Sequence, residues 1–171
     1  MFTKRFIIAT GLFVILASLA LGFRYKHYLF PYGEFQISSS APYAQWVTHV
    51  AAAPNGNFVV VWQNNLQDGS GWGIYARRYD AFGVPQGNEF LANTETAKNQ
   101  FVPRAAINAG SSFVIVWESK NQDGSGYGIY GQRYNADGVP QGNEFQINTY
   151  ARNNQFGPFI AIDATGNFIV A

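Results

Sequence analysis

Two loops of identical sequence contain the side chains best suited to metal binding or to tight turns. Each reads Gln-Asp-Gly-Ser-Gly and is followed by an aromatic residue, and the copies begin at Gln67 and Gln122. Carboxylate, amide and hydroxyl oxygens suit Ca²⁺, so Asp68 and Asp123 are candidate metal ligands. An Asp beside glycines also accepts backbone N–H bonds in turns, and one carboxylate per loop is few for Ca²⁺. We therefore expect turn-forming aspartates and no cofactor, with Ca²⁺ as the alternative.

The aromatic residues that close these loops are candidates for ligand contact. They are Trp72 in the first copy and Tyr127 in the second. If exposed at loop tips, these rings and Trp46 could stack on sugar rings; otherwise they seal contacts between structural units. Trp72 and Tyr127 are thus possible ligand-facing residues.

The remaining polar residues do not suggest an enzyme. Glu118 stands where the first copy has Gln63, Arg104 stands where the third copy has Phe159, and the chain has no cysteine. No nucleophile, base and oxyanion-stabilising group can be named together. Residues 31–171 carry seven Lys or Arg and ten Asp or Glu. A nucleic-acid groove needs clustered basic residues, so we expect no nucleic-acid partner.

A repeat of 55 residues must position these loops. Phe58, Phe113 and Phe168 lie at this spacing, and the same spacing separates Asp68 from Asp123. The runs FVVVW and FVIVW are apolar on both faces, which is typical of strands buried between two layers. Tyrosines at alternate positions and Gly-containing turns predict further short strands joined as hairpins.

Four short strands per repeat predict an all-β fold of propeller-like blades. We expect complete units at about 47–93 and 102–148 and a partial unit at 158–171, within a β-repeat region that spans 31–171. These make about two and a half repeats, and the pattern stops inside a strand, as in a truncated fragment. Open blade edges of this kind predict self-association.

The N-terminal 30 residues are of a different kind. Residues 6–23 form an uncharged apolar run flanked by basic residues on both sides. As a helix, 18 residues rise about 27 Å, enough to cross the hydrocarbon core of a membrane. We expect residues 1–30 to be a signal peptide or an uncleaved signal-anchor helix, and the repeats to lie outside the cytoplasm, membrane-anchored or secreted.

The pattern GNFVVVW…QDGSGWGIYARRYD…G and its second copy resemble tandem repeats of bacterial secreted and surface proteins, which look like sialidase-type propeller blades. The likeness covers residues 33–171. Sialidase-like blades carry an aspartate box, in outline Ser-x-Asp-x-Gly-x-Thr-Trp; the loops here share its Asp, glycines and aromatic residue but lack the Thr and differ in spacing. The resemblance implies a non-enzymatic surface or scaffold module that binds protein or glycan. The alternative it implies is a fragment of a sialidase-like glycoside hydrolase that lacks its catalytic blades.

Overall fold

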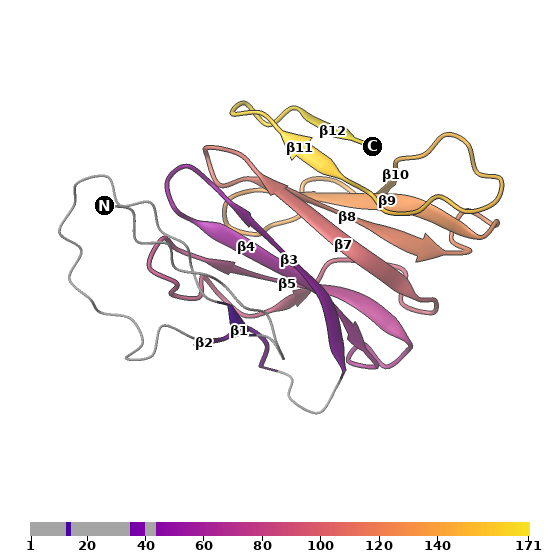
Figure 1. Cartoon of the computed structure of the whole chain (residues 1–171), viewed down its shortest axis with the longest axis horizontal. Helices are drawn as coiled ribbons and strands as arrows, with labels where there is room; N and C mark the ends of the chain where they lie inside the picture. Colours follow the sequence, from indigo (N-terminus) through magenta and orange to yellow (C-terminus); the bar gives the residue numbers. More distant parts are fainter. Residues whose placement is uncertain (1–12, 15–34, 40–43) are drawn as a thin grey trace.

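Every described element of the chain is a β-strand. The computed structural model describes residues 13–14, 35–39 and 44–171, and contains no helix in these ranges. Two four-stranded antiparallel sheets form the body, and a two-stranded hairpin follows at the C-terminal end (Figure 1). The predicted all-β class with repeated four-stranded units is therefore confirmed for the described residues.

The two sheets are built in the same way from consecutive strands. The first contains β3 (Gln45–Ala52), β4 (Phe58–Asn65), β5 (Trp72–Tyr79) and β6 (Phe90–Leu91), and the second contains β7 (Gln100–Ile107), β8 (Phe113–Lys120), β9 (Tyr127–Tyr134) and β10 (Phe145–Gln146). The hairpin pairs β11 (Ile160–Ile162) with β12 (Phe168–Val170). The register repeats as well, because Trp62 opposes Tyr75 in the first sheet and Trp117 opposes Tyr130 in the second. We call the first sheet blade 1, the second sheet blade 2 and the hairpin the partial blade.

The central strand of each complete blade is buried on both faces, as its sequence predicted. Val59 and Val61 of β4 point into a cluster shared with Phe113, Ile115 and Trp117 of β8. The alternate residues of β4, Phe58, Val60 and Trp62, form a second cluster with Ile37. Alternate side chains of a strand lie on opposite faces, so apolar residues in succession bury both faces of one sheet.

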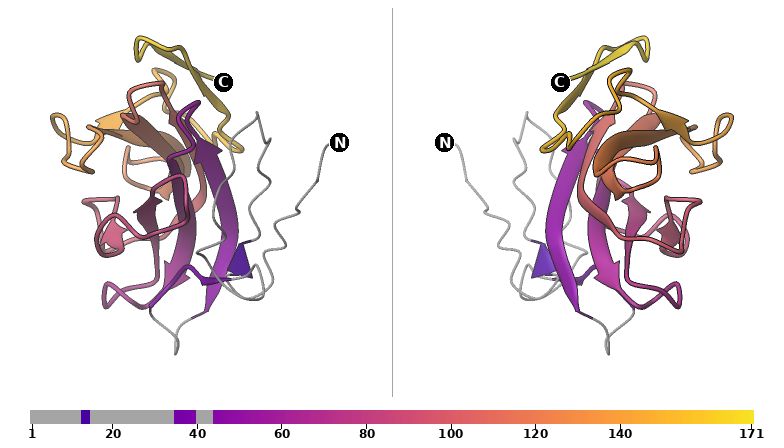
Figure 2. Two further views of the ribbon diagram at one scale, coloured as in Figure 1. Left: turned by 90° about the vertical axis from the view of Figure 1, so that its left-hand side faces the viewer. Right: turned by 90° about the vertical axis from the view of Figure 1, so that its right-hand side faces the viewer.

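The first strands of successive units lie next to one another. β7 contacts β3, and β11 contacts β7 (Figure 1). Side views show the sheets fanning out from these strands, with the β11–β12 hairpin at one side (Figure 2). This arrangement is consistent with incomplete propeller blades, in which the first strand is innermost.

Hydrogen bonds at equivalent positions join each blade to the unit before it. The Tyr79 hydroxyl donates to the Ile37 carbonyl, and the Tyr134 hydroxyl donates to the Ala92 carbonyl, both at 3.2 Å. Glu89 and Glu144 connect the loops to the preceding unit. Each accepts a hydrogen bond from the side-chain amide of the glutamine in the Gln-Asp-Gly-Ser-Gly loop of its own blade. Each also accepts a backbone N–H from the preceding unit, that of Ser39 or Thr94. The junction between units is therefore encoded in the repeat.

The predicted N-terminal helix lies largely outside the described residues. Of residues 6–23, only Phe13–Val14 is described, and it forms a short strand, β1, rather than helix. β1 pairs with β2 (Phe35–Gln36), which stands at the position of a last strand in the repeat. No described helix is long and apolar enough to span a membrane. The signal or anchor role of residues 1–30 remains a prediction.

Candidate functional site

Five aromatic rings form a continuous row across all three units. Neighbouring centroids are 5.6, 6.4, 6.1 and 5.1 Å apart and the ring planes are tilted by 42–53°. In order along the row, the rings are those of Trp46, Trp72, Phe101, Tyr127 and Phe156. These separations and tilts are typical of directly packed aromatic pairs. We call these five residues the aromatic row.

The row draws alternately on two kinds of element. Trp46 and Phe101 lie near the starts of the innermost strands β3 and β7, and Phe156 is at the equivalent position before β11. Trp72 and Tyr127 are the first residues of β5 and β9, directly after the Gln-Asp-Gly-Ser-Gly loops. Because each blade sets its innermost strand beside the loop of its neighbour, rings far apart in sequence become adjacent.

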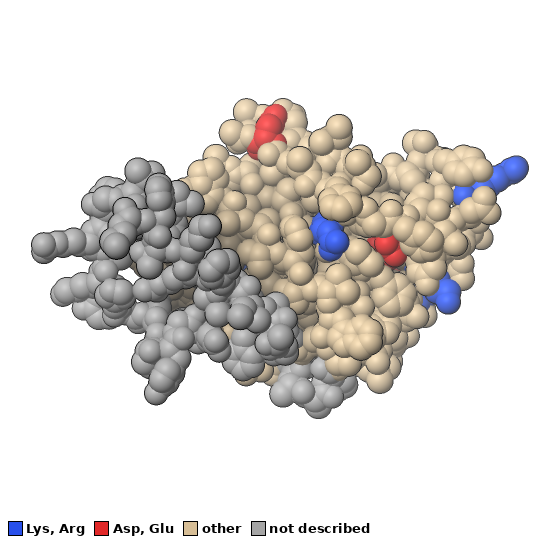
Figure 3. Space-filling model, viewed as in Figure 1, with Lys and Arg blue, Asp and Glu red and all other residues tan. Residues whose placement is uncertain are grey.

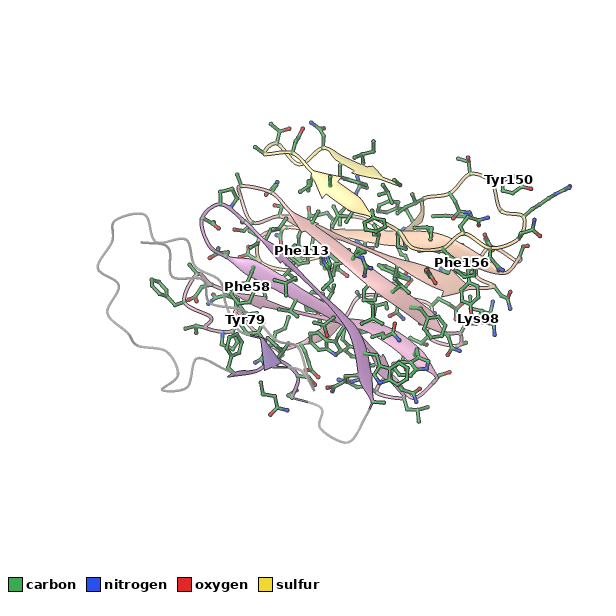
Figure 4. The ribbon with its side chains drawn as sticks, in the orientation of Figure 1. Phe58, Tyr79, Lys98, Phe113, Tyr150 and Phe156 are labelled. Atoms are coloured by element: carbon green, nitrogen blue, oxygen red, sulfur yellow. The ribbon has the colours of Figure 1, made fainter. Side chains whose placement is uncertain are left out.

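The row is accessible to a ligand, most of all at its two ends. Trp46 is 62% exposed and Phe156 is 60% exposed, whereas the three rings between them are half-buried. Figure 4 shows Phe156 and Lys98 at one end of the molecule, away from the Phe58, Tyr79 and Phe113 rings that pack inside the blades. Most of the surface seen from the same side is uncharged, but Lys or Arg side chains lie at the end where Figure 4 labels Phe156 (Figure 3).

A repeated backbone irregularity follows the inner-strand rings. The residue after each such ring has a left-handed conformation, with φ of 50° at Val47, 50° at Val102 and 66° at Gly157. In blades 1 and 2 this residue lies within a register shift of β3 against β4 and of β7 against β8. A β-branched residue at positive φ is a genuine outlier, and bulges re-aim the side chains beside them. The bulges thus set the direction of the row's inner-strand rings.

The side chain after each buried tryptophan accepts the backbone N–H of the left-handed residue in the next unit. Gln63 Oε1 accepts the Val102 N–H at 3.1 Å, and Glu118 Oε1 accepts the Gly157 N–H at 2.7 Å. Glu118 is only 5% exposed, and burial raises the pKa of its carboxyl, while the Gly157 bond and the Arg104 charge lower it. Glu118, singled out by its difference from Gln63, has the same structural task as that glutamine.

The loops beside the row are fixed by amide side chains of the next unit. Asn99 Oδ1 accepts the Trp72 N–H and Asn154 Oδ1 accepts the Tyr127 N–H, each at 3.1 Å. Each of the two loop rings is therefore attached through its own backbone to the neighbouring unit, which holds it in place within the row.

The two loop aspartates make the turn contacts expected of them. Asp68 Oδ1 accepts the Ser70 N–H at 3.1 Å, and Asp123 Oδ1 accepts the Ser125 N–H at 3.0 Å. The second oxygen of each carboxylate is buried without a hydrogen-bond partner among the described residues. This oxygen, Oδ2, occupies the space that a side chain at Gly73 or Gly128 would need, because a Cβ atom built on either glycine would lie 2.8 Å from it. Within the described ranges, no three His, Cys, Asp or Glu side chains form a metal-binding group.

A small set of ionisable residues lies on the innermost strands. His49 Nδ1 accepts the Ala105 N–H at 3.3 Å, and the Arg104 guanidinium lies 5.7 Å from the centre of the Phe159 ring. Burial, and then the charge of Arg104, lower the pKa of His49, which favours the neutral imidazole. The structure thus brings Arg104 close enough to influence both His49 and Glu118, a grouping that the sequence analysis did not find.

Comparison with known proteins supports the fold. No protein-family profile and no curated protein matches the chain. Among solved structures, it is similar to an endo-arabinase from Bacteroides thetaiotaomicron VPI-5482, with 14% sequence identity and a TM-score of 0.50. The match covers 77% of this chain and 52% of the endo-arabinase, so the chain corresponds to about half of that protein's length. At this identity the likeness shows a shared β-blade architecture and does not extend to activity.

The structure places the sequence-predicted aromatic residues together but adds two that were missed. Trp72 and Tyr127 were candidate ligand-facing residues, and both are half-buried members of the row. Phe101 and Phe156 were not identified, although both lie at multiples of 55 residues from Trp46. Reading that spacing for aromatic residues as well as for strands would have found them.

Proposed function

We propose that this protein is a non-enzymatic surface or scaffold module of propeller-like blades. The repeated junction between blades is the observation that supports this role most directly. Tyr79 and Tyr134 make one of its bonds at equivalent positions, and Glu89 and Glu144 make others. Because each unit is fixed to the one before by the same contacts, the loops at one end keep constant spacing, which suits a display scaffold.

We further propose that the N-terminal segment carries the repeats out of the cytoplasm. The 18 uncharged residues from Phe6 to Phe23 lie between basic flanks, and charges directly after such a run favour an anchor that is not removed. Expression in a bacterial host followed by cell fractionation tests this role. We expect the chain in the membrane fraction, with its repeats digested by protease added outside the inner membrane. An N-terminus at Leu21 would establish a cleaved signal, and a cytosolic chain would contradict export.

A second candidate function is that of a glycoside hydrolase fragment. The likeness to an endo-arabinase favours it, since that protein's name denotes cleavage of an arabinan backbone. Hydrolysis of this kind needs two carboxyl groups, one on each side of the scissile bond. Glu118 is buried, and its carboxylate accepts the Gly157 N–H. We therefore assign it to holding the backbone at Gly157 rather than to contact with a substrate. Release of reducing ends from arabinan, lost in Glu118→Gln, would favour this candidate; we expect no release.

A further inference from the structure

We propose that the aromatic row binds a neutral polysaccharide, whose sugar rings stack along Trp46, Trp72, Phe101, Tyr127 and Phe156. The apolar C–H face of a sugar ring packs on an aromatic face, while its hydroxyl groups bond to polar side chains at the edge. This site goes beyond the scaffold role and does not depend on it, because a scaffold needs no exposed rings.

The exposure of the row is built into the backbone rather than incidental. Val47 and Val102 hold left-handed conformations, which are unfavourable for a β-branched residue. Trp46 directly precedes one and Phe101 directly precedes the other. Such strain persists where the surrounding structure enforces it, and here Gln63 accepts the Val102 N–H. A ring needed only to fill the interior would not require a strained bulge and 62% exposure, as found at Trp46.

The chemistry around the row suits an uncharged, hydroxyl-rich chain. All five row residues are uncharged, and the side chains that hold its loops are the amides of Asn99 and Asn154. Two lysines lie near these groups: Lys98 precedes Asn99 and its Nζ donates to the Asn121 carbonyl at 2.9 Å, and Lys120 opposes Tyr127 in the β8–β9 register. An acidic polysaccharide, which these cations would attract, is therefore a rival ligand that the experiment must exclude.

Single-stranded nucleic acid also stacks on aromatic rows, but it requires a basic groove beside the rings. Lys and Arg neutralise the phosphates, and residues 31–171 hold only seven of these basic residues. Of them, Arg78 donates to the carbonyl groups of Ala136 and Gln86, where it joins blade 1 to a turn of blade 2. The charge pattern therefore favours a neutral ligand over a nucleic acid.

The packing of the rings argues against a proline-rich peptide. Such peptides dock into grooves lined by aromatic residues, with their prolines seated between the rings. Here each ring contacts the next at a centroid distance of 5.1–6.4 Å, which leaves no slot for a pyrrolidine between neighbours. The rings instead form a continuous row of aromatic surface, on which the apolar C–H faces of successive sugar rings can pack.

The repeat also predicts that binding strengthens with the length of the polysaccharide. Each complete blade supplies one ring from its innermost strand and one from its loop, Trp46 with Trp72 and Phe101 with Tyr127. Occupying two equivalent subsites with one chain makes the second contact intramolecular, which raises the overall affinity. Short oligosaccharides should therefore bind far more weakly than long ones.

Native affinity electrophoresis of the full chain tests the proposal. The protein is run in a polyoxyethylene detergent, whose head group contains no sugar, through gels that contain soluble arabinan, arabinoxylan, galactomannan or mixed-linkage β-glucan. Gels with polygalacturonate, and shift assays with a dT oligonucleotide and a proline-rich peptide, test the rival ligands. We expect retardation by at least one neutral polysaccharide and by none of the rivals.

Variants assign the binding to the row. Trp46→Ala and Phe156→Ala remove exposed rings and should weaken binding about tenfold each, as for loss of one stacked ring. Tyr150→Ala is the matched control, because Tyr150 is 61% exposed and lies outside the row. Circular dichroism spectra and melting temperatures of Trp46→Ala and Phe156→Ala that match those of the wild type separate loss of the surface from loss of folding.

Three outcomes would overturn the proposal. The first is no retardation by any of the four neutral polysaccharides. The second is retardation that Trp46→Ala and Phe156→Ala leave unchanged. The third is binding of polygalacturonate, the oligonucleotide or the peptide in preference to the neutral polysaccharides, which would assign the row to that class of partner instead. Export by the N-terminal segment is tested separately by fractionation and would survive any of these results.

Discussion

At the scale of single residues, the loop aspartates hold turns together by bonds from their carboxylates to backbone N–H groups. We predict that Asp68→Ala or Asp123→Ala lowers the free energy of unfolding by roughly 0.5–2 kcal/mol, because each loses the bond from Ser70 or Ser125. Chemical denaturation of the full chain measures this change. Since the aspartates serve the turn, millimolar Ca²⁺ should leave the melting temperature unchanged.

The competing metal hypothesis makes an opposite prediction for these same variants. If Ca²⁺ raised the melting temperature by several degrees, and an Asp68→Ala, Asp123→Ala double variant lost that gain, the turn interpretation would be wrong. Ser70→Ala is a suitable control, because its backbone N–H, not its side chain, bonds to Asp68.

Glu118 gives the protein a pH-dependent stability. Burial raises the pKa of this carboxyl in the folded state, so folding favours its protonated form. Its contribution is therefore most favourable below the ordinary pKa of 4.5 and declines as the pH rises through the folded-state pKa. Glu118→Gln removes this decline and retains an acceptor for the Gly157 N–H, as Gln63 does for Val102.

Thermal melts of the wild type and Glu118→Gln over pH 4 to 8 measure this effect. We expect the variant's advantage in melting temperature to grow with pH and then level off. An advantage that shrinks as the pH rises would show that the ionised carboxylate stabilises the fold, through Arg104 or another cation.

The role of a site residue could be predicted only where it depends on residues close to it in sequence. The turn bonds of Asp68 and Asp123 could be expected, because an Asp before Gly-Ser-Gly accepts N–H bonds from neighbours in sequence. The influence of Arg104 on Glu118 could not be predicted, since it depends on how two strands of blade 2 face each other.

At the scale of elements, the repeated bulge is the feature that aims the inner-strand rings. At Val102, with φ of 50°, any side chain with a Cβ is disfavoured by roughly 1–2 kcal/mol, whereas Gly pays roughly 0.5–1 kcal/mol in backbone entropy. We therefore predict that Val102→Gly is more stable than Val102→Ala by up to about 1 kcal/mol. Gly157, already glycine, occupies the equivalent position.

The control for this prediction is the same pair of substitutions, to Ala and to Gly, at a residue with ordinary strand geometry. At Val114, the second residue of β8 and paired on both sides in the sheet, Ala should be more stable than Gly. Equilibrium unfolding of the four variants provides the measurement. If Ala were also favoured over Gly at position 102, the bulge would not have the left-handed backbone described here.

Most strands could be predicted from the sequence, but the bulges and the row could not. Apolar runs bounded by turn residues identify β4 and β8, because burial of both faces imposes that pattern. A valine gives no local signal for a left-handed backbone; on the contrary, it favours an extended one. The row needs the packing of blades, which brings Trp72 beside Phe101 although 29 residues separate them.

At the scale of the whole molecule, the partial blade leaves an apolar edge. Among the described strands, β12 pairs only with β11, and Ile169 in β12 is 71% exposed. Unprotected apolar edges pair with other chains. We predict that residues 31–171 are oligomeric or aggregate, and that Ile169→Lys increases the monomer fraction. Size-exclusion chromatography with light scattering would contradict this if unmodified 31–171 eluted as a monodisperse monomer at high micromolar concentration.

The central claim is that three units place their rings in one surface that contacts a polysaccharide. Hydroxyl-radical footprinting of the full chain, with and without a neutral polysaccharide that retards it in gels, measures this contact at each ring. We predict that Trp46, Trp72, Phe101, Tyr127 and Phe156 lose reactivity together, while exposed Tyr150 and Phe159 do not change. Protection of Phe159 without the row, or no protection of any of the five rings, would contradict the account.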